Sequence, residues 1–270
     1  MKLNEIISAL NSYGADNSNE EAFLIIEEIY NIPRSKILAD REKSYTSPRI
    51  LEILEKRKER IPLQHIFGKW AFMGYEFFVS PDCLIPRPDT EILVEKALDV
   101  IKNGDHVADF CTGSGCIGIS LALKKPSIDL TLVDISEPAL NMARKNADKL
   151  GARARFVLGD IRTALAGEKF DVIVSNPPYI PTKDIASLSL EVKKEPILAL
   201  DGGERGLDLI EFLVGDGLSL LNDGGKMLIE FGYDQEKDID TCLKNNKNIS
   251  SYKIFYDYGG NPRCVLIHKY

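Results

Sequence analysis

From about residue 90 onward, strand-like segments alternate with helical ones, and this alternation constrains the fold more than any other feature of the sequence. The strand-like segments are HVADF, DLTLVD, ARFVLGD, FDVIVSN, GGKMLIEFG, SYKIFYDY and RCVLIHK. Helical stretches such as EPALNMARKNADKLG lie between the early ones. Strand–helix alternation predicts a mostly parallel sheet with both faces covered. Only GGNP joins the last two strands, so we expect them to pair antiparallel as a hairpin.

The first 69 residues have helical patterning instead. Ser18 is followed three residues later by Glu21, which matches a capping box at the start of a helix. A further helix is predicted with Ser47 as its N-cap and Pro48 at its first position. We therefore predict a small helical domain over residues 1–69.

An aromatic, strand-like stretch separates these two patterns. WAFMGYEFFV has Gly74 at its centre, which predicts a β-hairpin. The predicted organisation is therefore the helical domain, a hairpin linker over residues 70–89, and an α/β domain with a seven-stranded sheet over residues 90–270.

Composition and charge exclude several classes of protein. Hydrophobic residues make up 44% and charged residues 28% of the 270 residues, as in ordinary globular domains. No apolar run approaches the roughly 18 residues of a membrane span, and the amphipathic N-terminus does not resemble a signal peptide, so we expect a cytoplasmic protein. Residues 1–70 hold 11 basic and 11 acidic residues, so the remainder carries the whole net charge of −7. This balance argues against non-specific binding to nucleic acid and favours protein or small-molecule substrates.

Cysteine and histidine positions give no sign of a disulfide framework or a metal site. The five cysteines are odd in number and scattered, without a C-x-x-C pair, and the three histidines have no metal-ligand spacing. We expect neither a structural disulfide nor a bound metal.

A glycine-rich turn lies between a predicted strand and a predicted helix in VADFCTGSGCIGISLAL. Gly113, Gly115 and Gly118 fit the G-x-G-x-x-G pattern, and Asp134 ends the next strand. Taken alone, this arrangement is a dinucleotide-binding fingerprint, in which the acid binds ribose hydroxyls.

Acidic residues at three successive strand ends favour a different ligand. Asp109 lies just before the glycine turn, where its carboxylate would repel a pyrophosphate, and Asp160 follows the third strand. Three acids suit a nucleoside with a cationic tail and no phosphates, and S-adenosylmethionine is such a ligand. We expect Asp134 to accept from the ribose hydroxyls and Asp160 from the adenine amino group, with the Ile161 N–H facing the ring.

The fourth strand ends in an unusual way, because DVIVSNPPYI runs from apolar residues directly into Asn176, Pro177, Pro178 and Tyr179. Proline has no N–H to donate, so the strand cannot continue its ladder there. The topology puts this strand end beside the same pocket, since the carboxyl ends of parallel strands meet at one edge of a sheet.

The NPPY sequence resembles the signature of methyltransferases that act on planar amide or amine nitrogens. Further stretches narrow the resemblance, namely PLQHIFG, LIPRPDTEILVE, DFCTGSGCIGISLAL, VDIS, SNPPYI, EPILALDGGERGLD and IEFGYDQ. They follow one another in the order found in the PrmC/HemK family. The resemblance covers nearly the whole chain from about residue 60.

This resemblance implies a fold, an activity and a partner. The family joins a small N-terminal helical domain through a hairpin to a seven-stranded, Rossmann-like class I methyltransferase domain. It transfers a methyl group from S-adenosylmethionine, leaving S-adenosylhomocysteine, to the glutamine side-chain amide in the Gly-Gly-Gln motif of class I peptide chain release factors. For this chain the resemblance implies the same reaction, with the N-terminal domain helping to dock the release factor. We expect a monomer without a nucleic-acid substrate.

The resemblance also assigns roles to residues. Asn176 Oδ1 and the Pro177 carbonyl are expected to accept the two amide hydrogens, while Pro178 and Tyr179 form a flat wall. The expected cofactor-binding residues are Asp109, Cys111, Thr112, Gly113, Ser114, Gly115, Asp134, Ile135, Asp160, Ile161 and Asn176. The expected substrate-binding residues are Asn176, Pro177, Pro178, Tyr179 and Arg87. Arg87 could meet either backbone carbonyls or a substrate, and Glu195-Pro196 and Gly206-Leu207-Asp208 are expected to shape a loop over the site.

The chain departs from the family pattern in a few places. Cys111 stands where the family usually has Gly, and Phe110 where it usually has Leu. A Cβ at Cys111 requires a negative φ, and we interpret this residue as a small buried apolar side chain, not a reactive thiol. Asp89 is one methylene shorter than the usual Glu.

Three alternatives remain open at the level of sequence. An adenine methyltransferase for nucleic acid uses the same NPPY logic but needs a basic groove or a recognition insertion. An NAD-dependent oxidoreductase fits the glycine turn but leaves NPPY unexplained. A non-enzymatic scaffold that only binds a partner also fits the residue pattern.

Overall fold

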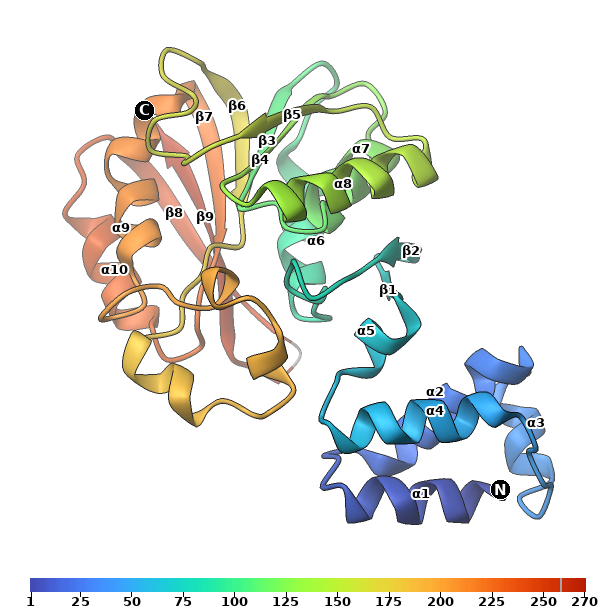
Figure 1. Ribbon diagram of the computed structural model, residues 1–270. Helices are drawn as coiled ribbons and strands as arrows, with labels where there is room; N and C mark the ends of the chain where they lie inside the picture. Colours follow the sequence, from blue (N-terminus) through green and yellow to red (C-terminus); the bar gives the residue numbers. More distant parts are fainter. Residues whose placement is uncertain (258) are drawn as a thin grey trace. The chain divides into compact units, whose positions relative to one another are not determined.

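The computed structural model describes residues 1–257 and 259–270 and divides into two compact units (Figure 1). Unit 1 comprises residues 1–68 together with a short distant segment, residues 189–194. Unit 2 comprises residues 69–188 and 195–270. The chain therefore passes from one unit to the other three times.

Unit 1 is a bundle of five helices over its own apolar core. The helices are α1 (Leu3–Ser12), α2 (Ser18–Tyr30), α3 (Arg34–Ala39), α4 (Pro48–Lys58) and α5 (Leu63–Phe67). Ile6, Leu10, Ile25 and Ile53 are among the residues that meet in this core. Burial of these apolar faces holds together helices that are too short to be stable alone.

The two helix starts predicted from sequence have different outcomes. The start of α4 is confirmed, because the Ser47 hydroxyl accepts from the Arg49 N–H at 3.3 Å and Pro48 is the first helical residue. The capping box at Ser18 is wrong. Asn17 precedes α2 without a side-chain cap, and the Glu21 carboxylate accepts from the Arg57 guanidinium instead. Glu21 thus pairs with Arg57 within the bundle and not with the backbone N–H at the start of α2, as a capping box requires.

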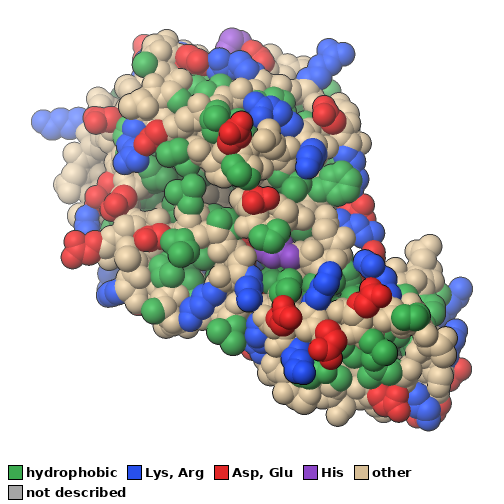
Figure 2. All heavy atoms as spheres, viewed as in Figure 1, with side chains coloured by type: hydrophobic (Ala, Val, Ile, Leu, Met, Phe, Trp, Pro, Cys, Tyr) green, Lys and Arg blue, Asp and Glu red, His purple; other side chains and the backbone are tan. Residues whose placement is uncertain are grey.

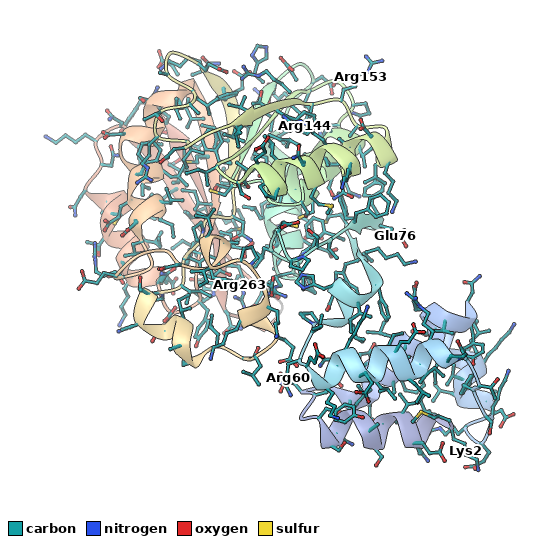
Figure 3. The ribbon with its side chains drawn as sticks, viewed as in Figure 1. Lys2, Arg60, Glu76, Arg144, Arg153 and Arg263 are labelled. Atoms are coloured by element: carbon teal, nitrogen blue, oxygen red, sulfur yellow. The ribbon has the colours of Figure 1, made fainter. Side chains whose placement is uncertain are left out.

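Arg57 explains why residues 189–194 belong to unit 1. Its side chain is only 2% exposed and binds both Glu21, at 2.8 Å, and Glu191, at 2.9 Å. Arg60, labelled in Figure 3, binds the other Glu191 oxygen at 2.7 Å. A buried guanidinium needs such partners, because an unpaired buried charge is strongly destabilising.

Unit 2 opens with the predicted hairpin, formed by β1 (Lys69–Phe72) and β2 (Tyr75–Phe78). The two-residue turn has φ of 52° at Met73 and 83° at Gly74. Positive φ at both positions is the geometry that matches the twist of paired strands. Asn146 fixes this hairpin, since its side chain accepts from the Phe78 N–H at 2.7 Å and donates to the Ser114 carbonyl at 2.9 Å.

The remainder of unit 2 is built on a seven-stranded sheet in the order β5-β4-β3-β6-β7-β9-β8. The strands are β3 (His106–Phe110), β4 (Asp129–Asp134), β5 (Arg155–Leu158), β6 (Phe170–Ser175), β7 (Leu221–Glu230), β8 (Ile249–Tyr256) and β9 (Pro262–Lys269). All pairs from β5 to β7 are parallel. The final antiparallel hairpin is confirmed, and Tyr258, at which we expected its first strand to end, lies outside the described residues.

Helices cover both faces of this sheet, as the alternation predicts (Figure 1). One face packs against α6 (Thr90–Val100), α7 (Cys116–Lys124) and α8 (Glu137–Leu150). The other packs against α9 (Asp208–Val214) and α10 (Glu236–Lys244). Short 3₁₀ segments lie at Thr182–Ser187, Val192–Lys194, Ile197–Ala199 and Asp216–Leu220. The predicted α/β class with a seven-stranded sheet is confirmed.

The strand order reverses at β3, since β4 lies on one side of it and β6 on the other. In open α/β sheets, ligands bind at such a point, beyond the carboxyl ends of the strands. The fold therefore singles out the segments after β3, β4, β5 and β6, which carry the glycine turn, Asp134, Asp160 and NPPY.

On the face shown in Figure 2, Lys and Arg side chains are interspersed with Asp and Glu side chains. In the described part of the chain, no helix combines the length and apolarity needed to cross a membrane.

Candidate active site

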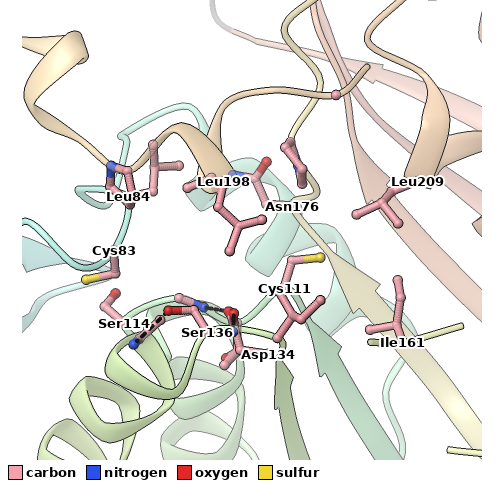
Figure 4. Close-up of a pocket in the computed structure, with 18 of the residues that line it drawn as sticks. Cys83, Leu84, Cys111, Ser114, Asp134, Ser136, Ile161, Asn176, Leu198 and Leu209 are labelled. Carbon is pink, nitrogen blue, oxygen red and sulfur yellow. Dashed lines mark hydrogen bonds between the residues drawn. The ribbon is translucent and has the colours of Figure 1, made fainter. Parts of the chain in front are cut away.

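A cavity of about 260 Å³ lies at the carboxyl ends of β3 to β6, and every residue that lines it belongs to unit 2 (Figure 4). Asp134 and Ser136 lie at one end of the cavity in this view, and Asn176 and Leu198 lie at the other. Cys111 points into the space between them. The predicted acid of the second strand and the predicted amide of the fourth therefore face one cavity.

The glycine turn between β3 and α7 is tightly packed. Gly113 and Gly115 have φ of 55° and 80°. A Cβ on Gly115 would lie 3.1 Å from the Ala143 side chain of α8, and one on Gly118 would lie 2.4 Å from the Leu132 side chain of β4. The last two glycines thus bring α7 close to β4 and α8, as the third glycine of a nucleotide-binding turn does.

Asp134, the last residue of β4, is the carboxylate that faces the cavity. It is 8% exposed, and its two oxygens accept from the Gly113 N–H at 2.8 Å and the Ser136 N–H at 2.9 Å. Burial raises the pKa of this carboxyl, and the backbone N–H groups oppose that rise. Each oxygen keeps a free lone pair, so Asp134 can accept further hydrogen bonds from ligand hydroxyls.

Asp109 was expected beside the cofactor, but it lies beneath the glycine turn and does not line the cavity. The side chain is fully buried, and its Oδ2 accepts from the Thr112 hydroxyl at 2.6 Å and the Gly118 N–H at 2.9 Å. Burial raises its pKa to about 7. Asp109 therefore fixes the turn, and its direct interaction with a cationic ligand stays a prediction.

Asp160 and Ile161 both line the cavity, beyond the end of β5. The Asp160 carboxylate pairs with Arg162, at 2.7 Å, and this partner lowers its pKa. The Asp160 carboxylate is thus ionised, its orientation is fixed by Arg162, and it can accept hydrogen bonds. Its role towards an adenine amino group stays a prediction.

The expected negative φ at Cys111 is wrong, because this residue has φ of 57°. The chain must turn sharply from β3 so that the Thr112 N–H reaches the Val133 carbonyl, at 3.1 Å, and the Gly113 N–H reaches Asp134. These contacts hold a non-glycine residue in a conformation that costs roughly 1–2 kcal/mol. Burial raises the pKa of the Cys111 thiol, which leaves it protonated and a poor nucleophile.

The NPPY segment follows β6 directly, and its four residues face different surroundings. Asn176 and Pro178 line the cavity, Pro177 between them is buried and does not line it, and Tyr179 packs against the core that α9 and α10 cover. The Asn176 Nδ2 donates to the Thr90 hydroxyl oxygen at 3.3 Å, and the Tyr179 hydroxyl donates to Glu230 Oε1 at 3.4 Å. Tyr179 therefore supports the cavity wall from behind, and its contact with an acceptor amide stays a prediction.

Arg87 lines the cavity and binds the carboxylate of Glu195. The other Glu195 oxygen accepts from the Ile85 N–H at 2.8 Å, deep in the protein. The partner that the sequence left undecided is thus a carboxylate. The pair joins the segment before α6 to the loop that begins at Glu195.

The expected loop over the site is present, since residues from Pro196 to Gly203 and Asp208 form one cavity wall, but the lining residues Leu198 to Gly203 were not singled out from sequence. A Cβ on Gly202 would lie 2.6 Å from the Pro178 carbonyl oxygen, and one on Gly206 would lie 2.2 Å from the Tyr179 carbonyl oxygen. These glycines let the loop pack against the NPPY backbone. The glycines of the run EPILALDGGERGLD are the signal in the sequence for this close packing.

Other lining residues were also missed, including Cys83, Leu84, Pro86, Thr90, Ser136 and Arg162. Ser136 gave no signal beyond its position next to a predicted helix and its place in the family stretch VDIS, and Thr90 gave none beyond its place in the family stretch LIPRPDTEILVE. In the described residues, no cluster of His, Cys, Asp or Glu could hold a metal ion.

Comparisons with known proteins assign the chain. Residues 2–68 match the model of the PrmC N-terminal domain, and residues 88–193 match that of the methyltransferase small domain. The release factor glutamine methyltransferase of Moorella thermoacetica is 36% identical, covering 99% of this chain and 97% of that protein. The enzyme of the same name from Bacillus subtilis is 37% identical, covering 97% and 95%.

The chain belongs to the release factor glutamine methyltransferase family. Solved structures agree on the fold. A methyltransferase from Pyrococcus furiosus covers 80% of this chain at 20% identity with a TM-score of 0.58, and the chain covers 98% of it. A ribosomal protein L11 methylase from Lactobacillus delbrueckii covers 71% at 20% identity with a TM-score of 0.52, and the chain covers 83% of it.

As a member of the release factor glutamine methyltransferase family, the chain is an S-adenosylmethionine-dependent methyltransferase. Its cavity fits that methyl donor. Asp134 offers carboxylate lone pairs, the turn at Gly113 brings backbone close to the ligand space, and Ile161 and Leu209 give apolar surface. This donor set contains acceptors for hydroxyl groups, and the two arginines that line the cavity, Arg87 and Arg162, are each paired with a carboxylate, which favours the methyl donor over a dinucleotide with its phosphates.

Proposed function

We propose that this enzyme methylates the side-chain amide nitrogen of the glutamine in the Gly-Gly-Gln motif of class I peptide chain release factors, and so modulates translation termination. One observation carries the proposal. Asn176, at the end of β6, faces the same cavity as Asp134, in a chain that is 36% identical along nearly its whole length to an enzyme named for this reaction. The side chain proposed to bind the acceptor amide and the side chain proposed to bind the nucleoside thus line one cavity.

An amide nitrogen is a poor nucleophile because its lone pair is delocalised into the carbonyl. Bound S-adenosylmethionine supplies an electrophilic methyl group on a sulfonium. The enzyme must therefore place the acceptor nitrogen in line with that methyl group, with the reacting atoms roughly 3–3.5 Å apart. Asn176 Oδ1 and the Pro177 carbonyl oxygen can accept the two hydrogens of one NH₂ group. These acceptors orient the nitrogen and stabilise the positive charge that develops on it.

Rigid neighbours support this geometry. The two prolines fix the backbone φ after Asn176, and Pro178 presents a flat face to the cavity. Asp134, with Gly113 and its neighbours in the turn, is proposed to hold the methyl donor at the other end. No covalent enzyme intermediate is required.

The remaining parts of the proposal concern the partner. The helical unit is proposed to help dock the release factor, and the enzyme is proposed to act as a monomer in the cytoplasm. The PrmC N-terminal domain match over residues 2–68 supports a role for this unit that is specific to the family.

The proposal is tested by supplying labelled S-adenosylmethionine together with one of three acceptors. These are a class I release factor, the same factor with its Gly-Gly-Gln glutamine changed to alanine, and duplex DNA. We expect label on the unchanged factor alone. Label on DNA, or equal label on both factors, would contradict the proposal, and cofactor binding without any transfer would support a scaffold.

A further inference from the structure

Asn176 has a difficulty that its position alone does not resolve. Its side-chain amide carries an acceptor, Oδ1, and a donor, Nδ2, on groups of nearly equal size. Only the oxygen can accept a hydrogen from the NH₂ group of a substrate. If the amide rotated by half a turn, two NH₂ groups would face each other. The enzyme therefore needs a device that fixes this orientation.

Thr90 is the first part of such a device. It is the first residue of α6, it is 2% exposed, and it lines the cavity. Its hydroxyl oxygen accepts from Asn176 Nδ2 at 3.3 Å, which leaves Oδ1 for the substrate. A hydroxyl can also donate, however, so Thr90 alone would tolerate either orientation of the amide.

Glu230 resolves this ambiguity. It is the last residue of β7, it is 2% exposed, and the reaction as derived above makes no use of it. Its Oε1 accepts from the Tyr179 hydroxyl, and its Oε2 has no hydrogen-bond partner in the described part of the chain. The Thr90 hydroxyl lowers the pKa of this carboxyl as a hydrogen-bonding group, which indicates that the hydroxyl lies close enough to turn towards the buried, unpaired Oε2. An ionised carboxylate only accepts, so it directs the Thr90 proton towards itself and the Thr90 lone pairs towards Asn176 Nδ2.

We propose that Glu230 and Thr90 are positioning residues for methyl transfer, in which ionised Glu230 orients the Thr90 hydroxyl and Thr90 then holds the Asn176 amide with its oxygen towards the acceptor nitrogen. Because Asn176 has its role only in the proposed function, the inference rests on that function. Both contacts of the NPPY segment are near the long end of hydrogen-bond distances, as is common in active sites before substrate binds.

The surroundings of Glu230 give the device a dependence on pH. Burial raises the pKa of Glu230 to about 7, and the charge of Asp89, which precedes α6, acts in the same direction. The hydroxyls of Thr90 and Tyr179 and the charge of Arg263 on β9 oppose the rise. Figure 3 labels Arg263, which is itself paired with Asp89 and Asp257, each at 2.9 Å.

Two thiols complete the surroundings of Glu230. Burial raises the pKa of the thiols of Cys116, at the start of α7, and Cys264, on β9. The charge of Glu230 acts in the same direction, so both thiols stay neutral. Among the groups that face the Thr90 hydroxyl, the one that titrates near neutral pH is thus Glu230. Asp109, whose pKa is also raised to about 7, lies beneath the glycine turn and bonds to Thr112 and Gly118 instead. When Glu230 is protonated it can donate to Thr90, and the Thr90 hydroxyl is then free to donate to Asn176 Oδ1. Turnover should therefore rise with pH through about 7.

The test compares Thr90→Val, Thr90→Ser and Glu230→Gln in the full-length enzyme, with S-adenosylmethionine and a release factor. Val has the shape of Thr without the hydroxyl, so we expect kcat to fall about tenfold or more while the Kd for S-adenosylmethionine stays within about threefold. Ser keeps the hydroxyl and should restore most of the rate. Glu230→Gln should lose the rise in rate through pH 7. Equal losses in the Ser and Val variants, or an unchanged pH profile in Glu230→Gln, would overturn the inference.

A second measurement does not depend on turnover. With ¹⁵N-labelled asparagine, the side-chain signal of Asn176 should titrate near pH 7 in the unsubstituted enzyme and should not titrate in Glu230→Gln. A signal that is insensitive to pH, in a folded enzyme that binds S-adenosylmethionine, would overturn the inference. If the enzyme methylates an acceptor other than the release factor, the proposed function fails, and the same variants still test the positioning with that acceptor.

Discussion

The two ends of the cavity are held by different kinds of contact. At the glycine turn, the carboxylates of Asp109 and Asp134 accept from backbone N–H groups, so the path of the chain fixes them. At the NPPY segment, the side chains of Asn176 and Tyr179 meet other side chains, those of Thr90 and Glu230. Substitutions at the glycine turn should therefore affect the stability of the fold and the binding of the methyl donor. The second end can be altered without disturbing the backbone, and its substitutions should act mainly on turnover.

Asn176→Ala should produce the largest effect. Removing this acceptor should reduce kcat by on the order of 10² or more, because a preorganised contact with the developing charge is lost. The Kd for S-adenosylmethionine should change little, which isothermal titration calorimetry would measure alongside methylation rates. Near-normal methylation of a release factor by this variant would show that substitutions at the NPPY end do not act mainly on turnover.

Asp109→Asn should alter the dependence of stability on pH. The folded pKa of about 7 lies above the ordinary value of 3.8, so between them the native state binds more protons than the unfolded state. The free energy of unfolding should therefore decrease from pH 5 to pH 7, with Asp109 contributing on the order of 2 kcal/mol. Urea denaturation at several pH values would measure this, and the contribution should vanish in Asp109→Asn.

Glu230→Gln is the matched control, because burial raises the pKa of Glu230 to about 7 as well. It should remove a similar part of the stability slope, but it alone should change the pH profile of turnover. An Asp109→Asn enzyme that kept the full slope would show that this carboxyl titrates normally.

Asp134→Ala should weaken S-adenosylmethionine binding by about tenfold. The substitution removes the carboxylate that is expected to accept from the ligand hydroxyls, and it also leaves the backbone N–H groups of Gly113 and Ser136 without their acceptor. At saturating methyl donor, kcat should fall much less. Asp160→Ala is a useful comparison, because Asp160 is tied to one surface arginine and not to the turn. A larger loss of kcat than of affinity in Asp134→Ala would place this residue with the NPPY end.

Cys111→Gly should give the smallest change, a stabilisation of up to about 1 kcal/mol, because glycine adopts a φ of 57° without strain. Cys111→Ala keeps the Cβ and therefore the strain, so the difference between the two variants isolates the backbone effect. Chemical denaturation would measure both. A glycine variant less stable than the alanine variant would show that the turn is not strained.

The strands, their mostly parallel pairing and the final antiparallel hairpin followed from sequence because each physical rule was local. Alternating apolar residues predict β3 and β4, and parallel pairing then brings Asp134 and Asn176 to one edge of the sheet. What sequence could not give depends on distant partners. Thr90 and Glu230 are 140 positions apart in the chain, and nothing in either neighbourhood indicates the other.

Local rules also failed where tertiary contacts opposed them. Glu21 matches a capping box, yet the buried Arg57 binds it more strongly than a backbone N–H would. Cys111 has a Cβ, yet the hydrogen bonds of Thr112 and Gly113 hold it at positive φ. Both errors share a cause, because an intrinsic preference of about 1 kcal/mol gives way to a contact that is worth more.

The segment 189–194 has a consequence for how such a protein can be divided. Because Glu191 is held by Arg57 and Arg60, unit 1 is assembled from two separate stretches of the gene, and the second is embedded within the methyltransferase coding region. Neither unit corresponds to one continuous stretch of the chain. A chain beginning at Lys69 would still carry the hexapeptide without its basic partners, two residues before Pro196 of the cavity wall. Exchange of the helical unit between homologues would therefore need to transfer both stretches together.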